Sequence, residues 1–551
     1  MKEPNTDKED IIFCGRNYWS EEILDGLVKK RIDGREFSVY CNAPVSLYDS
    51  LKNAEKKWPD KICLVDDDGT FFTYERFLKL VDGFSTFLHR EYRIGHGSHV
   101  GVLLYNSLEY CASIYALNRL GAVMVPLSTK YKEQETKSFI KRADLSGIIF
   151  HKDFEEWFLK EDTEMFQLCM DIGRLKELAV ENETCAAEDE EILPIPKEND
   201  TAIMMFTSGT TSRSKGVLLK NYSVMHAIMV YQRIFQIDDT DNTILPIPAY
   251  HITGLAAVIG LFIHAGGCVW LHKFFDANRI AKEMEQKPIT FFHASPTIFS
   301  MLLTEKKEHP DILLLEKIAC GSGNMPQAKI QEMKEWIPTM EFHTVYGLTE
   351  TSSPATIFPG DAAAGEHRGS AGRPIPGIEF KICDRRGCTL KPGMVGTVCV
   401  KGTVVTSGYY GIENQELSDG WLDTGDIGRI DQEGYLYIVD RKKDMINRGG
   451  EKVCSYDVEN VLYEVPGVHE AAVIGIPDEI YGEVPAAMIV PEKNKALKEE
   501  DIRVYLKERL AKFQIPAVIV FAGSLPMTPG MKIDKNKIRI LLQSDYGRKK
   551  L

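Results

Sequence analysis

Apolar residues in the first two thirds of the chain alternate between short runs typical of buried strands and longer stretches with helical spacing. Val100–Leu104 is a short apolar run, Ser107–Leu120 has the period of a helix, and Ala122–Pro126 is apolar again. Strand, helix and strand joined by short connections predict βαβ units in a parallel sheet. The pattern returns at Leu255–Ala265 and Cys268–Leu271, so the predicted fold class is α/β.

The periodicity changes twice towards the C-terminus. Between residues 365 and 440 helical spacing fades, and short alternating runs predict a small β-rich subdomain. Beyond it, a helix at Ser455–Tyr463 and a strand at Val468–Ile476 predict a separate small α+β domain. We therefore expect a large N-terminal domain of residues 1–442, built from parallel-sheet α/β subdomains and the β-rich subdomain, followed by a C-terminal domain of residues 443–551.

Composition narrows the class of protein. The 551 residues are 44% hydrophobic and 26% charged, which is typical of a globular protein. The net charge of −14 argues against a nucleic-acid partner, which normally meets a basic surface. No apolar run reaches the length of a transmembrane helix, and the charged N-terminus lacks the apolar core of a signal peptide. The 12 cysteines show no metal-ligand spacing, so we expect reduced thiols and a cytoplasmic location.

One stretch combines the residue types that hold phosphate groups. Residues Thr207–Gly216 read TSGTTSRSKG, and the apolar run Ala202–Phe206 before them predicts a short strand. Backbone amides beside a glycine can form an anion-binding nest, hydroxyl groups donate hydrogen bonds, and Lys215 adds a positive charge. Because Gly216 follows Lys215, the stretch does not match the GxxxxGK[ST] phosphate loop. A flexible Ser/Thr turn is the alternative.

Four further segments carry candidate chemistry. They are the loop PAYHITG with His251, the segment Tyr346–Glu350, the triplet Thr424–Asp426 and the tail Leu525–Lys532. Each has a structural alternative when taken alone, namely a buried histidine, the first turn of a helix, a plain turn and a solvated lysine. Their order and separation make the set more specific than any one member.

Together the five segments resemble the motifs of the AMP-forming acyl-CoA synthetases, which belong to the adenylate-forming superfamily. The resemblance extends over roughly residues 45–540. It implies ATP, Mg²⁺ and CoA: the acid attacks the α-phosphate of ATP to give acyl-AMP and pyrophosphate, and the thiol of CoA then displaces AMP. Both steps develop negative charge on phosphate oxygens, which a metal ion, lysine and oriented amides stabilise. The small domain would be mobile between the two steps.

The resemblance also implies which residues hold the nucleotide. Thr349 would contact the α-phosphate and Glu350 would ligate Mg²⁺, since this ion takes few carboxylates beside phosphate oxygens. Tyr346, followed by Gly347, would stack on adenine. The residues implied for the β- and γ-phosphates are Thr207, Ser208, Gly209, Thr210, Thr211 and Lys215. The residues implied for the edge of the base are Gly321, Ser322 and Gly323, which alone predict only a turn.

The last motifs imply the ribose site, a hinge and the catalytic lysine. Asp426 would accept hydrogen bonds from the ribose hydroxyls, with Arg441 in support. Lys443 falls at the hinge of the family, where the small domain would pivot. Lys532 would bridge the acid carboxylate and the α-phosphate in the first step. The turn Gly449–Gly450 would line the route of the pantetheine arm of CoA in the second step, with a plain glycine turn as the alternative.

The chain departs from the common motifs at three positions. Ser212 and Ser214 stand where the hydroxyl-rich loop usually has Gly and Pro, and Met531 stands where Gly usually precedes the catalytic lysine. The loss of Pro adds a backbone donor and flexibility to the loop. The loop variant resembles that of carnitine-type CoA ligases. We expect these changes to affect the rate of the first step rather than the reaction.

The acid is the least specified substrate. His251 would line or gate the acyl pocket, or else be a buried structural histidine. The other side chains expected there, Phe291, Phe292 and Met325, are apolar, so we predict a medium- or long-chain aliphatic acid, with an aryl or carnitine-type acid as the alternative. An enzyme that loads a carrier protein and a nucleotide-binding protein without catalysis are further alternatives. A homodimer and, for a long-chain acid, a peripheral membrane contact are compatible with the sequence.

Overall fold

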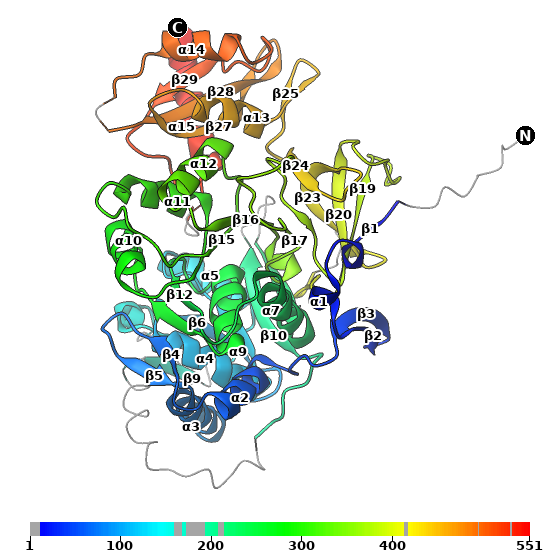
Figure 1. Ribbon diagram of the computed structural model, residues 1–551, viewed down its shortest axis with the longest axis vertical. Helices are drawn as coiled ribbons and strands as arrows, with labels where there is room; N and C mark the ends of the chain where they lie inside the picture. The colour runs from blue at the N-terminus through cyan, green and yellow to red at the C-terminus, as the bar shows by residue number, and fades with distance from the viewer. Residues whose placement is uncertain are drawn as a thin grey trace, which may run out of the picture.

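The chain forms a large body and a small C-terminal domain that lies against one end of it (Figure 1). The computed structural model describes residues 11–158, 168–171, 173, 193–207, 214–412, 417–493, 495–528 and 532–550. Two α/β sheets with their helices and one β-rich subdomain make up the large body, as the sequence predicts.

The first α/β sheet carries the strand that leads into the hydroxyl-rich loop. Among the described residues its seven strands have the order β21-β11-β10-β7-β6-β8-β9. β6 is parallel to β7 and to β8, as the βαβ pattern predicts, whereas β10 and β11 form an antiparallel hairpin. In sheet order the strands are β21 (Gly408–Tyr409), β11 (Lys215–Lys220), β10 (Thr201–Thr207), β7 (Val123–Pro126), β6 (His99–Leu103), β8 (Gly147–Phe150) and β9 (Leu168–Asp171).

The second α/β sheet has nine strands in the described part of the chain, in the order β18-β17-β16-β15-β14-β12-β13-β4-β5. Strands β12, β14, β15 and β16 are parallel, so their carboxyl ends bring the segments that follow them to one edge of the sheet. In sheet order the strands are β18 (Arg373–Pro374), β17 (Thr356–Ile357), β16 (Glu341–Tyr346), β15 (Lys317–Cys320), β14 (Phe291–Ala294), β12 (Asn242–Leu245), β13 (Cys268–Leu271), β4 (Ile62–Val65) and β5 (Phe71–Thr73).

The β-rich subdomain predicted after residue 365 is an antiparallel sheet, in which β24 pairs with β23 beside the path β1-β19-β20-β23-β22. The register of β23 and β24 sets Asp426 directly opposite Arg441. Its strands are β1 (Phe13–Cys14), β19 (Ile378–Cys383), β20 (Gly396–Gly402), β22 (Leu417–Ser418), β23 (Trp421–Ile430) and β24 (Leu436–Arg441). A separate hairpin pairs β2 (Leu27–Ile32) with β3 (Arg35–Tyr40).

Helices of the large body begin at the polar residues that favour helix starts. Ser46, Thr73 and Ser107 each accept a hydrogen bond from a backbone amide of the first helical turn. The helices are α1 (Glu21–Leu24), α2 (Leu47–Lys57), α3 (Tyr74–Tyr92), α4 (Leu108–Arg119), α5 (Glu133–Arg142), α7 (Asn221–Phe235), α8 (Ile252–Gly254), α9 (Leu261–Ala265), α10 (Ala277–Gln286), α11 (Pro296–Leu302) and α12 (Gln327–Trp336). Short 3₁₀ segments are η1 (Gly15–Asn17), η2 (Lys152–Trp157), η5 (Leu303–Glu305) and η6 (Thr349–Thr351).

The most apolar stretch, Leu255–Ala265, is a buried helix as predicted, but it is not α-helical throughout. The segment η4 (Leu255–Gly260) is a π-helix that continues α8 into α9 without a break. A Cβ atom on Gly260 would lie 2.7 Å from Cδ1 of Ile228, so this helix packs closely on α7. Of the helices in the described residues, none combines the length and apolarity needed to cross a membrane.

The small domain has its own sheet and its own core. The helix predicted at Ser455–Tyr463 is present as α13, and the strand predicted from Val468 extends further than expected. The sheet order is β26-β25-β28-β27, with β29 beside β28. The elements are β25 (Ile446–Arg448), β26 (Glu451–Val453), α13 (Ser455–Tyr463), β27 (Val468–Asp478), β28 (Gly482–Pro491), α14 (Glu499–Lys507), β29 (Val518–Phe521) and α15 (Lys535–Lys550).

The hydrophobic clusters divide at the junction of the two domains. The main cluster of the large body ends at Leu436, and the first cluster of the small domain begins at Ile446. Between them the chain turns, with the amides of Asp444 and Met445 both donating to the carbonyl of Arg441. The domain boundary predicted between residues 442 and 443 falls within this turn and stays a prediction.

Candidate active site

The hairpin of β10 and β11 holds the two ends of the hydroxyl-rich loop. Thr207 ends β10 and pairs with Lys215, which begins β11. The Lys215 ammonium lies 4.9 Å from the ring centroid of Tyr409. The loop residues outside the described part of the chain are Ser208, Gly209, Thr210, Thr211, Ser212 and Arg213. The hairpin therefore fixes where the loop begins and ends, beside Tyr409.

Strand β16 brings the second motif to the edge of the sheet. Tyr346 ends the strand, and the short η6 segment that follows contains Thr349 and Glu350. A Cβ atom on Gly347 would lie 1.5 Å from the carbonyl oxygen of Ser353, so only glycine fits between them. Gly347 is thus needed for the sharp path that sets Thr349 and Glu350 next to Tyr346.

The carboxyl group of Glu350 lies close to Tyr409, Arg441 and Lys215. The Tyr409 hydroxyl donates to its Oε1 at 3.3 Å. Burial raises the pKa of Glu350, although its own backbone amide, Tyr409, Arg441 and Lys215 act in the opposite direction. Among the described residues no group of three His, Cys, Asp or Glu side chains could hold a metal ion alone. The residues present therefore fit Mg²⁺ shared with phosphate oxygens rather than enclosed by protein ligands.

Asp426 is buried at the point where the β-rich subdomain meets the second sheet. Its Oδ2 accepts a hydrogen bond of 2.6 Å from the Tyr346 hydroxyl, and its Oδ1 lies 3.4 Å from Nε of Arg441. Burial raises the pKa of Asp426, while Arg441 and then Tyr346 favour its ionised form. Tyr346, predicted to stack on adenine, and Asp426, predicted to bind the ribose, are therefore in direct contact with each other.

The turn of Gly321, Ser322 and Gly323 follows β15 at the same edge. Ser322 has a φ of 70°, a left-handed conformation that is uncommon for a residue with a side chain. A Cβ atom on Gly321 would lie 3.1 Å from the carbonyl oxygen of Val345 and 3.5 Å from Nε2 of His293. The turn thus lies against the end of β16 and beside a buried histidine.

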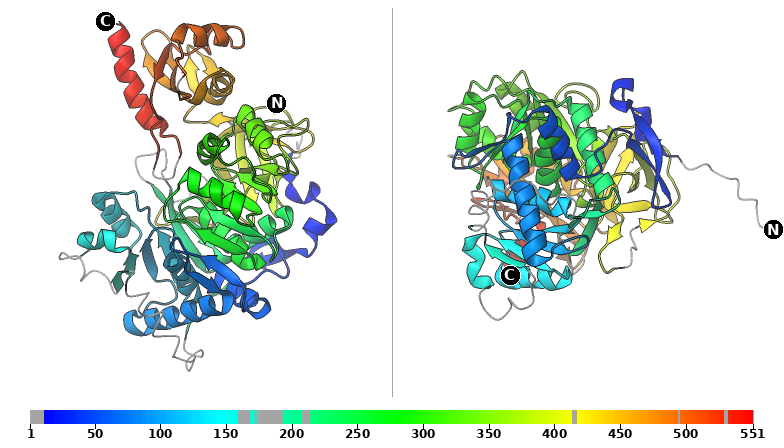
Figure 2. Two further views of the ribbon diagram at one scale, coloured as in Figure 1. Left: turned by 60° about the vertical axis from the view of Figure 1, so that its left-hand side comes forward. Right: turned by 90° about the horizontal axis from the view of Figure 1, so that it is seen from below.

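Lys532 reaches these residues from the small domain. In Figure 2 the segment before α15 extends from the small domain down to the large body. The Lys532 amide donates to Oγ1 of Thr528, and its carbonyl accepts from the Thr528 amide. The side chain is solvent-exposed, yet the surrounding protein and then Arg441 lower the pKa of Lys532 to about 8, against the opposing charges of Glu350 and Asp426.

These hydrogen bonds, ion pairs and electrostatic interactions define the Lys532 cluster, which consists of Tyr346, Glu350, Asp426, Arg441 and Lys532. Its members come from the second sheet, the β-rich subdomain and the small domain. Thr349 and Lys215 lie beside it through Glu350. The arrangement concentrates two carboxylates and two cations at one place, which suits a triphosphate bound with a metal ion.

His251 also belongs to this region. It precedes α8, and its pKa is lowered to about 3, first by burial and then by the positive charges of Lys532 and Lys130. Its Nε2 is buried and has no hydrogen-bond partner among the described residues. His251 is therefore a neutral imidazole close to Lys532, with one polar atom left for another molecule.

Three predicted residues lie apart from the Lys532 cluster. Lys443 is exposed in the turn between β24 and β25. Gly449 and Gly450 form the turn between β25 and β26, with φ angles of 60° and 96° that favour glycine. The Gly449 amide donates to the carbonyl of Tyr481 within the small domain. Among the described residues, the structure therefore brings together several of those predicted for the first step, namely Tyr346, Glu350, Asp426, Arg441 and Lys532, whereas the Gly449–Gly450 turn predicted for the second step has its contacts within the small domain.

Two residues of the site carry no sequence motif. Tyr409 contacts both Glu350 and Lys215, and nothing in its GYY context indicates this. His293 lies within the apolar strand β14, one residue before its end, and is buried beside Gly321. A single histidine within an apolar run was the available signal for His293, because a buried polar residue normally needs a partner.

Known proteins match this fold and site over most of the chain. The model of the AMP-binding enzyme family matches residues 51–410, and that of the AMP-binding enzyme C-terminal domain matches residues 457–532. Oxalate–CoA ligase of Arabidopsis thaliana is 29% identical over 501 residues, which are 88% of this chain and 96% of that enzyme. Feruloyl-CoA synthase of Amycolatopsis sp is 30% identical over 86% of this chain and 94% of that enzyme.

A solved structure agrees with the sequence comparisons. O-succinylbenzoate coenzyme A synthetase of Bacillus subtilis, in complex with ATP and magnesium ion, superposes with a TM-score of 0.77 at 30% identity and covers 89% of this chain and 98% of that one. The fold and these matches define an AMP-forming acid–CoA ligase that uses ATP and Mg²⁺. The chain belongs to the AMP-binding enzyme family, within the adenylate-forming superfamily. Since the relatives use acids of several kinds, they do not support the predicted aliphatic substrate.

Proposed function

We propose that the chain activates an acid that carries a hydrogen-bonding group, of which a hydroxylated or carbonyl-bearing aryl acid is the leading example, and transfers its acyl group to CoA. The observation that carries this proposal is that two buried imidazole nitrogens near the sheet edge of the site, Nε2 of His251 and Nδ1 of His293, have no hydrogen-bond partner among the described residues. His251 follows β12 and His293 is the next-to-last residue of β14, so both lie near the sheet edge that carries the Gly321 turn.

His293 contributes most to this argument. It is 1% exposed, and burial lowers its pKa to about 3, so the ring is neutral at physiological pH. A neutral imidazole has one donor and one acceptor nitrogen. A buried polar atom without a partner costs about 1–3 kcal/mol, so a saturated chain beside it would leave that cost in place, whereas a hydroxyl or carbonyl would remove it.

Two of the three apolar side chains behind the aliphatic prediction pack on other rings of the core. Phe291 and Phe292 are fully buried. Phe291 packs on Phe235 and Phe262, and Phe292 packs on Phe299. Their rings belong to the core of the second sheet, so the expected hydrocarbon walls are absent at these two positions. The relatives that act on oxalate, succinylbenzoate and ferulate support a polar acid.

The roles of the residues in the first step follow from their charges. Glu350 would hold Mg²⁺ together with phosphate oxygens, and Asp426 would accept hydrogen bonds from the ribose. Lys532 would neutralise the carboxylate and the α-phosphate as one oxygen of the acid attacks phosphorus and the bond to pyrophosphate breaks. Bound ATP supplies the leaving group for this step. Thr349 and Lys215 would contact the phosphates from the η6 and β11 sides.

The second step needs a different placement of the small domain. Gly449 and Gly450 have contacts within the small domain and lie away from the Lys532 cluster. We propose that the small domain turns about the segment near Lys443, which withdraws Lys532 and brings the Gly449–Gly450 turn to the acyl-AMP. The thiol sulfur of CoA then attacks the acyl carbon and AMP leaves. Homodimerisation, membrane contact and a cytoplasmic location remain predictions.

A panel of acids tests the substrate proposal. Purified enzyme, ATP, Mg²⁺ and CoA are supplied with saturated C4–C16 acids, hydroxylated aryl acids, unsubstituted aryl acids and dicarboxylic acids, and AMP release is measured. We expect the highest kcat/KM with acids that carry a hydrogen-bonding group. His293→Leu should lower kcat/KM for these acids about tenfold relative to the matched acid without the polar group. Equal loss for both acids, or highest activity with saturated chains, would refute the proposed substrate class.

A further inference from the structure

A second candidate site lies on the helical face formed by α2, α7 and α9. A cavity of about 480 Å³ opens there, which is within the usual range of about 300–1,000 Å³ for small-molecule sites. In Figure 1, α2 and α9 lie in the lower part of the molecule, whereas the domain that carries Lys532 is at the top. No lining residue belongs to the Lys532 cluster, so the cavity is separate from the candidate active site.

The charge of this cavity differs from that of the chain. Its described lining includes the cations Lys56, Lys57 and Arg233 and contains no carboxylate. The whole chain, in contrast, has 80 acidic and 66 basic residues. A concave surface that gathers charge of one sign raises the local concentration of the opposite ion. The cavity therefore attracts anions although the protein as a whole repels them.

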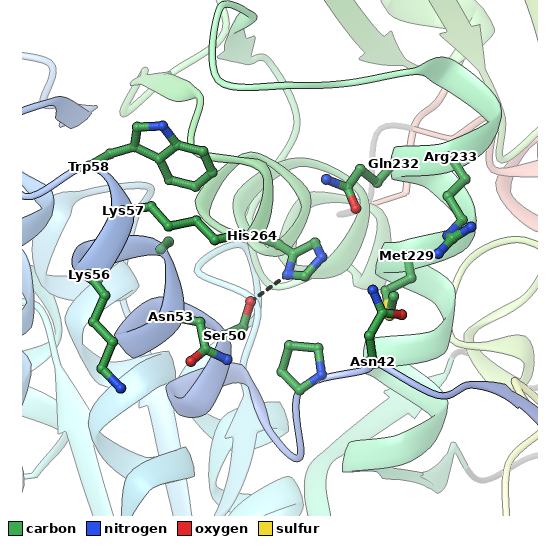
Figure 3. Close-up of a pocket in the computed structure, with 12 residues that line it drawn as sticks. Asn42, Ser50, Asn53, Lys56, Lys57, Trp58, Met229, Gln232, Arg233 and His264 are labelled. Atoms are coloured by element: carbon green, nitrogen blue, oxygen red, sulfur yellow. Dashed lines mark hydrogen bonds between the residues drawn. The ribbon is translucent and has the colours of Figure 1, made fainter. Parts of the chain in front are cut away.

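Neutral hydrogen-bonding groups accompany the cations. The amide side chains of Asn42, Asn53 and Gln232 line the cavity, and none of the three forms a side-chain hydrogen bond with another described residue. Figure 3 shows Asn53 among the α2 residues and Gln232 among the α7 residues, with His264 between the two groups. Amides on both sides can bind the polar body of a ligand whose charge is met by the cations.

The floor and walls of the cavity are held by packing. Ser50 is 3% exposed, and its Oγ is 2.8 Å from Nδ1 of His264. The Arg233 guanidinium lies over the Tyr40 ring at 4.2 Å. Trp58 packs so closely on Gly266 that a Cβ atom there would lie 2.6 Å from the indole ring. These contacts fix the shape of the cavity before a ligand binds, which lowers the entropic cost of binding.

We propose that this cavity binds a phosphate-bearing small molecule. A phosphate monoester carries a charge of about −1.5 to −2 near neutral pH, which matches the three cations better than a single carboxylate does. Lys57 and Arg233 line the cavity from α2 and α7 and provide the charge for the phosphate, with Lys56 at its edge (Figure 3), and the amides with Trp58 provide contacts for an organic body. The shared chemistry is the phosphate group, which either inorganic phosphate or a phosphate ester supplies.

Calorimetric titration of the full-length enzyme tests this proposal. The Lys532 cluster is first saturated with a non-hydrolysable ATP analogue and Mg²⁺, so that added ligands report on the second cavity. The probes are ribose 5-phosphate, inorganic phosphate and ribose. We expect one ribose 5-phosphate to bind per chain and ribose not to bind. Equal affinity for inorganic phosphate assigns the site to the phosphate group alone, and tighter binding of ribose 5-phosphate assigns it to an ester.

Matched variants locate the binding. Lys56→Gln combined with Lys57→Gln should weaken ribose 5-phosphate binding at least about tenfold, because each charge-assisted contact is worth about that factor. Lys307→Gln, which removes one positive charge at an exposed position elsewhere, should leave the affinity within about twofold. Asn53→Asp, also at an exposed position, should weaken ribose 5-phosphate binding by adding a carboxylate to the cavity. This variant tests the proposal if the double lysine variant does not fold.

Two results would overturn the proposal. One is the absence of binding of both phosphate probes to the analogue-saturated enzyme. The other is an affinity for ribose 5-phosphate that Asn53→Asp and the double lysine change leave unaltered, or that Lys307→Gln lowers to the same extent. Either result would show a general attraction of anions to the protein rather than binding in this cavity.

Discussion

The hydroxyl of Tyr346 donates a 2.6 Å hydrogen bond to Oδ2 of Asp426, although the two residues are 80 positions apart in the chain. Tyr346 ends a strand of the second α/β sheet, and Asp426 lies in the β-rich subdomain. One short bond therefore joins the two parts of the large body at the place where adenine and ribose are expected to bind. Because Asp426 is 2% exposed, the bond also holds a carboxylate that water hardly reaches.

Loss of the Tyr346 hydroxyl should weaken ATP binding. Tyr346→Phe keeps the ring but leaves Asp426 with Arg441 alone, and a hydrogen bond to a charged group is worth about 1.5–3 kcal/mol. We expect KM for ATP to rise about tenfold in acid-dependent pyrophosphate exchange, with a smaller change in KM for the acid. Tyr437→Phe, which removes a hydroxyl bonded to His367 in the same subdomain, is the control. An unchanged KM for ATP in Tyr346→Phe would contradict the role of this bond.

Replacement of Lys532 should separate the two half-reactions. Lys532→Ala removes the cation expected to bridge the acid and the α-phosphate, so acid-dependent pyrophosphate exchange should fall at least about a hundredfold. Thioester formation from supplied acyl-AMP should change less than about threefold, because Lys532 withdraws in that step. Lys537→Ala, on the exposed side of α15, should affect neither. Equal losses in both half-reactions would show that Lys532 has no step-specific role.

The pH dependence of adenylation should report the ammonium of Lys532. The pKa of Lys532 is lowered to about 8, mainly because nearby protein reduces its hydration and Arg441 repels it. The protonated form is the active one, so kcat/KM for pyrophosphate exchange should be highest below pH 8 and decline as the pH rises through this value. Lys532→Arg should remove the decline, since guanidinium stays charged. A decline that persists in the Arg variant would assign the titration to another group.

Glu350 should set the requirement for Mg²⁺. Glu350→Gln keeps the size of the side chain and removes its charge, so the Mg²⁺ concentration for half-maximal activity should rise at least about tenfold. Glu341→Gln, at the exposed start of β16, the strand that precedes η6, should leave this Mg²⁺ concentration unchanged. The measurement is pyrophosphate exchange at fixed ATP over a range of Mg²⁺. A parallel loss of activity at every Mg²⁺ concentration would instead indicate that Glu350 acts on the fold of η6.

The sequence predicts more of the fold from its local patterns than it does of the Lys532 cluster. Apolar residues that alternate or form short runs predict the strands and the β-rich subdomain, and apolar residues at helical spacing predict the helix α13. These patterns can be recognised because each depends on residues that are neighbours in the chain. The parallel sheets follow from βαβ connections. The π-helix η4 did not follow, because its pitch depends on close packing of Gly260 against Ile228. The residues assigned to the first step came from the family resemblance rather than from periodicity, and their roles stay predictions.

The acid site shows the limit of prediction from sequence. Phe291 and Phe292 were expected in the pocket because they lie near its motifs, but strand direction and packing place both rings in the core. His293, the next residue, carries the buried polar atom on which the substrate proposal rests. Which residue of a short apolar strand faces a ligand depends on the neighbouring strands, and that information is not in the local pattern.

Buried neutral histidines should make the protein lose stability in acid. Burial lowers the pKa of His293 to about 3 and that of His226 to about 4, from an ordinary value near 6.5. Between these values the unfolded chain binds protons that the native state does not, so the free energy of unfolding is largest above pH 6.5 and falls as the pH decreases. Each histidine contributes up to about 1.4 kcal/mol per pH unit in this range. Urea unfolding midpoints at pH 7.5, 6.5 and 5.5 should decrease, and His293→Gln should reduce the decrease. His96→Gln, at a side chain that is 56% exposed, should not, and an equal effect of both changes would contradict the burial argument.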